Sequence, residues 1–252
     1  MGVDPAEAGY DPEGVPLVAL VYDGLVAYRR VAGTAGNVLV GDLATSVPSP
    51  SADGRAYVFT LRRGLRYADG TPVRAGDFRA SIQRLLRTVG HDVPLYESIV
   101  GVTRCERDPK RCDLSRGIAA DERARTITLH LTRADPNLIW NLAIPAASFV
   151  HPERPAPAGA LPPVGTGPYR VSRFGKHTGA LLVRNPRFRS WSQDARPDGL
   201  ADRIEVTVAS DIKTQARAVA QGAADLVPYF GGALASLPGV AAQYTSEVRG
   251  DR

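Results

Sequence analysis

Two cysteines offer the clearest opportunity for side-chain chemistry in this sequence. Cys105 and Cys112 lie in a polar segment with six residues between them, and the Asp108-Pro109 pair favours a turn that would bring their Cβ atoms within the ~4 Å of a disulfide. We expect this bond, which implies an oxidising, extracytoplasmic compartment; two unpaired thiols on a surface loop are the alternative. A zinc site is disfavoured because it needs further ligands nearby, and the four histidines are scattered singly: His91, His130, His151 and His177.

No residue pattern in the sequence indicates a catalytic site. The sequence contains no GxSxG elbow, no HExxH, no Walker loop and no GxGxxG after a strand. Ser81, Ser98 and Ser148 have no histidine in a recognisable arrangement around them. We therefore expect a protein that is not an enzyme and that holds no metal and no cofactor, with a catalytic site lacking any known motif as the alternative.

The composition is that of a globular chain without a nucleic-acid partner. Its 252 residues, 44% of them hydrophobic, are enough to bury a core. The 31 basic residues exceed the 26 acidic ones, but the two kinds are interleaved and no five like charges run together. A nucleic-acid or membrane-surface partner is therefore not expected. No stretch of about 18 apolar residues could cross a bilayer, and we interpret the start at Met1 as a domain boundary downstream of any export signal.

Periodicity in the first part of the chain predicts two helices and one strand. The segment from Leu17 to Tyr28 fits a helix better than a strand. Alternating apolar residues from Tyr57 to Leu61 predict a strand that leaves a tight turn at Asp53-Gly54. A second helix is expected from Ala75 to Arg87, with Asp77 in the first turn, where the helix dipole favours an anion.

The later part of the chain predicts further strands around a long irregular connection. Residues Thr126 to Leu131 and Ile204 to Val208 alternate with period two. Between them, the proline-rich segment from Pro145 to Pro168 predicts a crossover without regular structure. A short helix is expected to begin at an Asp211 cap and to end at Gly222, and Asp225 to Val227 is expected to start another strand.

Several spaced blocks of residues are more specific than any single motif. In chain order, the blocks are residues 22–26, 42–44, 51–64, 67–78, 165–169, 184–188, 204–208 and 221–225. Together they resemble the signature of family 5 extracellular solute-binding proteins, the dipeptide-, oligopeptide- and nickel-binding components of ABC importers. The resemblance covers the chain from Asp4-Pro5 to about Asp225, with one departure at Ala223, where the family usually has an acid.

Turn geometry accounts for the motif residues without giving them a place in a binding site. Asp-Gly pairs permit positive φ in tight turns, and glycines before a strand let the backbone bend sharply. We therefore expect structural roles for Asp53, Gly54, Asp69, Gly70, Gly165 and Gly167.

The resemblance implies an α/β fold of the periplasmic-binding-protein-like class II, cluster C type, with a mixed sheet. Residues 1–45 and 164–252 would form an incomplete first-lobe sheet domain. Residues 46–163 would form the extra α/β subdomain characteristic of the family. Members are about twice this length, so the second, ligand-closing lobe is expected to be absent after Arg252.

The resemblance also implies the function. The chain is expected to be the solute-binding component of an ABC importer, a monomer that captures a peptide or similar small solute in an interlobe cleft and delivers it to an ABC permease. Its location would be extracytoplasmic, as a cell-surface lipoprotein or a periplasmic protein. The alternative is a sensor or interaction domain of a larger regulatory protein that retained the solute-binding lobe.

Six residues are expected to contact the solute: Tyr10, Glu13, Val15, Tyr96, Tyr229 and Phe230. The Glu-Gly-Val-Pro run that begins at Glu13 resembles the ligand loop of oligopeptide-binding members, where an acid meets the peptide. Tyr96 lies where peptide-binding relatives place a tyrosine beside the ligand. Tyr229 and Phe230 follow a strand whose end faces the cleft in the family. The alternative is that each aromatic ring is an ordinary core or surface residue.

Overall fold

The structure, a computed structural model, describes residues 2–8, 14–89, 94–152, 161–175, 177–209 and 211–227. The elements in chain order are α1 (Pro5–Ala8), α2 (Val15–Val21), β1 (Val26–Tyr28), η1 (Gly33–Asn37), β2 (Leu39–Gly41), β3 (Ala56–Thr60), α3 (Ala75–Val89), η2 (Pro94–Tyr96), α4 (Val102–Arg107), η3 (Pro109–Arg111), β4 (Ile118–Asp121), β5 (Thr126–His130), α5 (Leu138–Asn141), η4 (Pro145–Ala147), β6 (Tyr169–Gly175), β7 (Gly179–Arg184), β8 (Arg203–Val206) and α6 (Ile212–Ala220).

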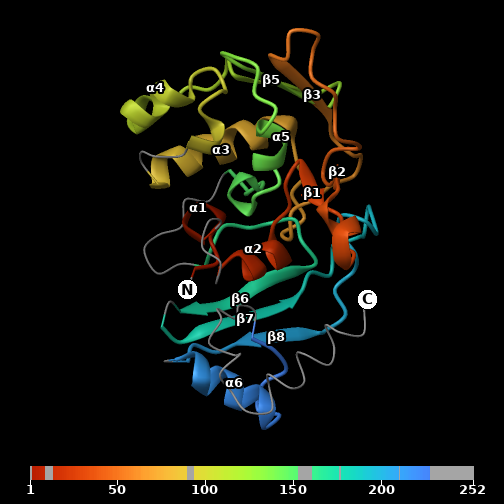
Figure 1. Ribbon diagram of the computed structural model, residues 1–252, viewed down its shortest axis with the longest axis vertical. Helices are drawn as coiled ribbons and strands as arrows, with labels where there is room; N and C mark the ends of the chain where they lie inside the picture. The colour runs from red at the N-terminus through yellow and green to blue at the C-terminus, as the bar shows by residue number, and fades with distance from the viewer. Residues whose placement is uncertain are drawn as a thin grey trace.

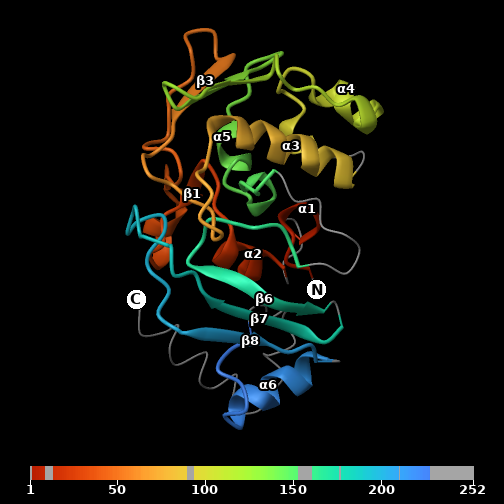
Figure 2. The same cartoon turned by 180° about the vertical axis from the view of Figure 1, so that it is seen from behind.

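The elements form three groups along the long axis of the molecule (Figure 1). One end holds α3, α4, β3 and β5, and the other end holds β6, β7, β8 and α6. The helix α5 lies beside α3, the helices α1 and α2 and the pair β1 and β2 lie between the two ends, and the reverse view in Figure 2 shows the same order.

The sheet at one end is an antiparallel meander covered by α2. Strand β7 lies between β6 and β8, in the order β6-β7-β8. The α2 residues Leu17, Val18 and Val21 are buried in one cluster with Tyr169 of β6 and Leu182 of β7. This cluster fixes the sheet against the N-terminal helix.

The sheet at the other end has the order β3-β5-β4 and packs against α3. Phe78, Ile82 and Leu85 recur at helical spacing and are buried with Phe59 of β3 and Ile127 of β5. The predicted helix from Ala75 to Arg87 is thereby confirmed, and it continues to Val89.

One predicted helix, from Leu17 to Tyr28, is wrong in its second half. The helix α2 ends at Val21, and the chain then forms the strand β1, which pairs with β2. The physical reason lies far along the chain: the carboxylate of Asp23, just after the helix, is bound by Arg196 and Thr166. These tertiary contacts and the strand pairing override the local apolar pattern.

The other regular elements follow the sequence more closely. The strands predicted at Tyr57–Leu61, Thr126–Leu131 and Ile204–Val208 correspond to β3, β5 and β8. Asp211 caps α6 as expected, because its Oδ1 accepts a hydrogen bond from the backbone N–H of Thr214 at 2.9 Å.

Two further predictions concern the Pro145–Pro168 connection and the segment Asp225–Val227. Within the described part of the Pro145–Pro168 connection, the single 3₁₀ turn η4 is the only regular element, as expected. The strand predicted to start at Asp225 is not formed at Asp225–Val227, where this described segment ends.

The glycines of the motif blocks are required for two different reasons. Gly54 and Gly70 have φ of 71° and 97°, which confirms the turn prediction. Gly165 and Gly167 are not among the positive-φ glycines; instead, each is tightly packed against the end of α2. A Cβ at Gly165 would lie 2.2 Å from the carbonyl oxygen of Val21. Gly167 and Pro168 form the expected bend directly before β6, and close backbone approach is a further reason for glycine at both positions.

The predicted domain division, with residues 1–45 and 164–252 against residues 46–163, stays a prediction. The described residues contain two hydrophobic clusters, and the larger one includes Leu25 and Leu43 together with Phe59. Part of the first range therefore shares a core with the second.

The disulfide between Cys105 and Cys112 is present, as the sequence predicts. Cys105 is buried on α4, and Cys112 follows η3, with 4.4 Å between the two Cα atoms.

None of the described helices is long and apolar enough to cross a membrane.

We expect removal of the disulfide to loosen one end of the molecule without unfolding it. The loop that it closes is short, with a sequence separation of 7, and chain entropy then gives about 2–3 kcal/mol. Urea denaturation of the Cys105→Ala/Cys112→Ala variant should show a loss of this size and a cooperative transition. Two titratable thiols in oxidised, denatured wild-type protein would contradict the bond.

We expect Gly165→Ala to destabilise the protein, because its Cβ would overlap the carbonyl of Val21. Overpacking of this kind costs about 1–3 kcal/mol. Gly76→Ala is the matched control, since its Cβ would meet only the end of the Glu122 side chain, at 3.2 Å. Equal free energies of unfolding for the two variants would show that the close approach at Gly165 is not a constraint.

Candidate functional site

Four of the six residues expected to contact the solute lie outside the described residues: Tyr10, Glu13, Tyr229 and Phe230. Val15 is the first residue of α2 and is half-buried. Tyr96 is fully buried in the larger hydrophobic cluster. The proposed groove that joins these residues therefore stays a prediction.

The described segments that flank these positions pack against neighbouring elements. Helix α1 lies against α3 and η4, and η2 lies against α5. The hydroxyl of Tyr96 donates to the carbonyl of Asn141 at 3.1 Å, and the Asn141 side chain donates back to the carbonyl of Leu95 at 2.9 Å. Asn141 is a positioning residue that the sequence analysis missed, since a lone asparagine carries no motif.

A partly buried ion pair anchors α1 to α3. The guanidinium of Arg84 binds both carboxylate oxygens of Asp4, with a distance of 2.8 Å from Nη1 to Oδ1. Asp4 also accepts a hydrogen bond from the backbone N–H of Ala6 at 2.9 Å. The pair thus fixes the start of the N-terminal segment that leads to the predicted ligand loop.

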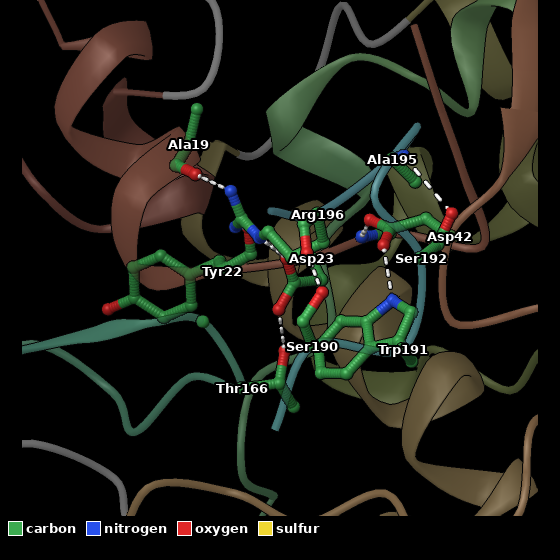
Figure 3. Close-up of polar contacts among 12 residues, drawn as sticks. Ala19, Tyr22, Asp23, Asp42, Thr166, Ser190, Trp191, Ser192, Ala195 and Arg196 are labelled. Atoms are coloured by element: carbon green, nitrogen blue, oxygen red, sulfur yellow. Dashed lines mark hydrogen bonds and ion pairs between the residues drawn. The ribbon is translucent and has the colours of Figure 1, made fainter. Parts of the chain in front are cut away.

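A buried polar network, shown in Figure 3, joins three distant parts of the chain. Asp23 and Arg196 form an ion pair whose side chains are 0% and 6% exposed. Thr166, from the proline-rich crossover, donates its hydroxyl to the other carboxylate oxygen of Asp23. Because a buried charge is tolerated only when it is paired and hydrogen-bonded, each member needs the others.

Arg196 also completes the C-terminal end of α2. Its Nη1 donates to the carbonyl of Ala19, and its Nη2 donates to the carbonyl of Tyr22 at 2.6 Å. The backbone N–H of Gly167 donates to the carbonyl of Val21 at 2.9 Å. The last carbonyls of a helix lack partners within the helix and favour a cation, so these contacts explain where α2 stops.

A second buried carboxylate, Asp42, belongs to the same network. Its Oδ1 accepts a hydrogen bond from the indole N–H of Trp191 at 3.0 Å, and its Oδ2 accepts one from the backbone N–H of Gly24 at 3.3 Å. Burial, and then the negative charge of Asp23, raise the pKa of Asp42 from 3.8 to about 7. Asp42 therefore titrates near neutral pH.

The buried network holds the end of α2, the proline-rich crossover and the loop after β7 together, and it presents no reactive side chain to a ligand. Asp23, Asp42, Thr166 and Arg196 are all buried, and each has hydrogen-bond partners within the protein. Within the described segments, no three His, Cys, Asp or Glu side chains form a group that could hold a metal ion. This arrangement positions backbone segments and does not indicate catalysis.

Asp23, Asp42 and Thr166 lie in motif blocks that are recognisable in the sequence, but the sequence does not indicate their partners. Arg196 and Trp191 lie outside those blocks. The only local signal is an acid inside an apolar run, at Asp23, which indicates a charge that must be compensated if it is buried. The sequence does not show which of the many arginines pairs with Asp23.

Comparison with known proteins gives one consistent result. Residues 38–245 match the family model described as "Bacterial extracellular solute-binding proteins, family 5 Middle". The chain is 29% identical over 175 residues to the probable D,D-dipeptide-binding periplasmic protein DdpA of Escherichia coli (strain K12), covering 66% of this chain and 30% of the relative. It is 26% identical over 215 residues to the glutathione-binding protein GsiB of Salmonella choleraesuis (strain SC-B67), covering 82% and 38%.

Solved structures agree with this result. The clavulanic acid biosynthesis oligopeptide binding protein 2 is 28% identical with a TM-score of 0.79, over 97% of this chain and 44% of that one. The pheromone receptor PrgZ, at 22% identity, has the same fold with a TM-score of 0.75, over 98% and 47%. The likeness confirms the expected periplasmic-binding-protein-like α/β fold. The chain spans less than half the length of each of these relatives.

We expect Asp42→Asn to change how the free energy of unfolding depends on pH. The folded-state pKa of about 7 lies above the ordinary 3.8, so the contribution of Asp42 is fully present below about pH 4 and is lost as the pH rises through about 7. The neutral amide does not titrate, so the stability of the variant relative to wild type should be higher at pH 8 than at pH 4 by a few kcal/mol, at about 1.4 kcal/mol for each pKa unit.

Urea denaturation between pH 4 and pH 8 measures this difference. The control is Asp202→Asn, which removes an exposed carboxylate. Parallel pH profiles for wild type and Asp42→Asn would contradict a raised pKa at Asp42.

Proposed function

Because the chain belongs to family 5 of the bacterial extracellular solute-binding proteins, we propose that it captures a small peptide for delivery to an ABC permease outside the cytoplasm. The observation that carries the proposal is the family match over residues 38–245, supported by agreement in fold over 97% of the chain. Binding of this kind needs no bond chemistry. Its free energy comes from buried contact area and from hydrogen bonds.

The peptide class is favoured by what the relatives bind. Their names refer to a D,D-dipeptide, glutathione and an oligopeptide. Short peptides share an α-amino group, a carboxylate and a row of backbone amides. A site that pairs with these groups binds peptides of many sequences, while side-chain pockets add specificity.

The proposed solute-contacting face is built around the start of α2 and the segments next to η2. We assign six residues to this face or to its support: Tyr10, Glu13, Val15, Tyr96, Tyr229 and Phe230. Val15 begins α2, whose other end is held by Arg196. Tyr96 is buried, so its part is to hold η2 in place through Asn141 rather than to offer an exposed ring. Rigid supports of this kind reduce the entropy lost when a ligand binds.

The remaining parts of the function follow from the same family membership. In the two-lobe arrangement that the resemblance implies, this chain would supply one wall of the cleft, and closure around the solute would bury the rest. One wall by itself makes only part of the contacts. We therefore propose that the chain is a monomer that binds peptide weakly when the opposing wall is not present.

The experiment that tests the proposal is a titration of the chain with di- and tripeptides, followed by NMR. We expect weak, saturable shifts of the amide signals around Val15. Glu13→Gln should weaken the binding of a peptide with a free amino terminus about tenfold, because a charge-assisted hydrogen bond contributes about 1.5–3 kcal/mol.

The matched control is Glu7→Gln, which neutralises an exposed acid on the nearby α1. It should leave the affinity unchanged, and an amino-terminally acetylated peptide should not distinguish Glu13→Gln from wild type. Equal effects of the two substitutions would remove Glu13 from the site. Absence of binding by any short peptide, with binding of another solute class, would overturn the peptide assignment.

A further inference from the structure

A surface cavity of about 450 Å³, broadly open to solvent, lies between the loop after β3 and the loop after β7. Its lining residues are Gly64, Arg66, Gly70, Pro186, Arg187 and Arg189. Half of them are arginines and none is acidic, so the wall presents guanidinium groups from two segments far apart in the sequence. None of these residues is among the six assigned to the solute-contacting face.

We propose that this cavity is a binding site for a small, multiply charged oxyanion of the phosphate type, separate from the peptide site. Arginine is suited to this ligand because its planar guanidinium presents several N–H donors in a fixed geometry that matches phosphate oxygens. Three positive groups around one cavity favour a ligand with two negative charges over a carboxylate with one.

The three guanidinium groups are held in place by backbone carbonyl groups. Arg66 donates from Nη1 to the carbonyl of Gly70 at 2.8 Å, and Arg187 donates from Nη1 to the carbonyl of Ala68 at 3.2 Å. Arg189 donates from Nη1 to the carbonyls of Pro186 and Phe188 at 3.1 and 2.7 Å. Each contact uses one nitrogen and leaves the other donors of the group for a ligand.

These arginines keep their full charge for a ligand because no carboxylate neutralises them. Within the part of the chain that the structure describes, Arg66, Arg187 and Arg189 make no ion pair within 4.0 Å. One nearby exposed arginine differs: Arg184, on β7, pairs with Asp202 at 3.3 Å. The chain also carries a net charge of +5, so the wider field favours an anion.

Two glycines in the lining have different effects: nothing lies within 4 Å of a Cβ at Gly64, which leaves that side of the cavity open, while Gly70 lets the Arg187 side chain approach closely. Gly64 and Gly70 have φ of 76° and 97°, which a side chain would strain. The Arg187 side chain crosses Gly70, and a Cβ there would lie 2.9 Å from its Nε. Pro186 is the only apolar side chain in the lining, so the cavity does not suit an apolar solute.

An NMR titration of the chain with inorganic phosphate tests the proposal. We expect saturable shifts of the Gly64 and Gly70 amide signals and an affinity that falls with ionic strength. Arg66→Ala/Arg187→Ala should weaken phosphate binding at least about tenfold, because it removes two groups that donate charge-assisted hydrogen bonds. Arg66→Ala alone should give an intermediate loss.

The control is Arg173→Ala, which removes the same charge from an exposed arginine on β6 that pairs with Glu205 at 3.4 Å. It should leave phosphate affinity within about twofold of wild type. Thermal melting of each variant verifies that it is folded. Equal losses in the control and the double variant, equal shifts with acetate, or binding to phosphatidylglycerol vesicles without binding of free phosphate would each overturn the proposal. Peptide binding by the double variant should be unchanged, so this test is independent of the proposed function.

Discussion

The buried ion pair between Asp23 and Arg196 is the constraint on which the rest of the structure depends. Its two side chains are almost completely removed from water, and the two residues lie 173 positions apart. Transferring two charges into the interior costs several kcal/mol for each ion unless geometry and further hydrogen bonds offset it. The surrounding structure supplies these partners, and every segment that supplies one is thereby fixed.

Three segments meet at this pair for that reason. The end of α2 provides backbone carbonyls for Arg196, the proline-rich crossover provides the Thr166 hydroxyl, and the loop after β7 provides Arg196 itself. Close approach between the crossover and α2 leaves no space for a side chain at Gly165 or Gly167. The motif that contains these glycines is therefore a packing requirement of the ion pair's surroundings rather than part of a binding site.

The charged residues that stabilise the fold are separate from the charged residues that we propose to bind a ligand. Charges that stabilise the fold are satisfied within the protein, as in the network of Asp23, Asp42 and Arg196. The arginines around the cavity between the loops after β3 and β7 are instead held by backbone carbonyls and keep their charge. The same residue type thus stabilises the fold in one place and is available to a ligand in another. The difference is whether a carboxylate lies within reach.

The sequence by itself determined the disulfide, the helix α3, the strands β3 and β5, and the cap of α6. Each of these depends on residues close together in the chain: the apolar period of Phe78 and Ile82, the turn between Cys105 and Cys112, or the hydrogen bond of Asp211 to Thr214. The spaced motif blocks added the family, which the match over residues 38–245 confirms.

Only the tertiary structure decided where α2 ends, why Gly165 is a glycine, which arginine neutralises Asp23, and which arginines share a cavity. The apolar run after Leu17 fits a helix better than a strand, yet partners up to 173 positions away end the helix at Val21. Among the 31 basic residues, nothing local distinguishes Arg196 from the others. Arg196 has this role because the fold buries it beside Asp23. Two opposite charges attract strongly only where water does not screen them.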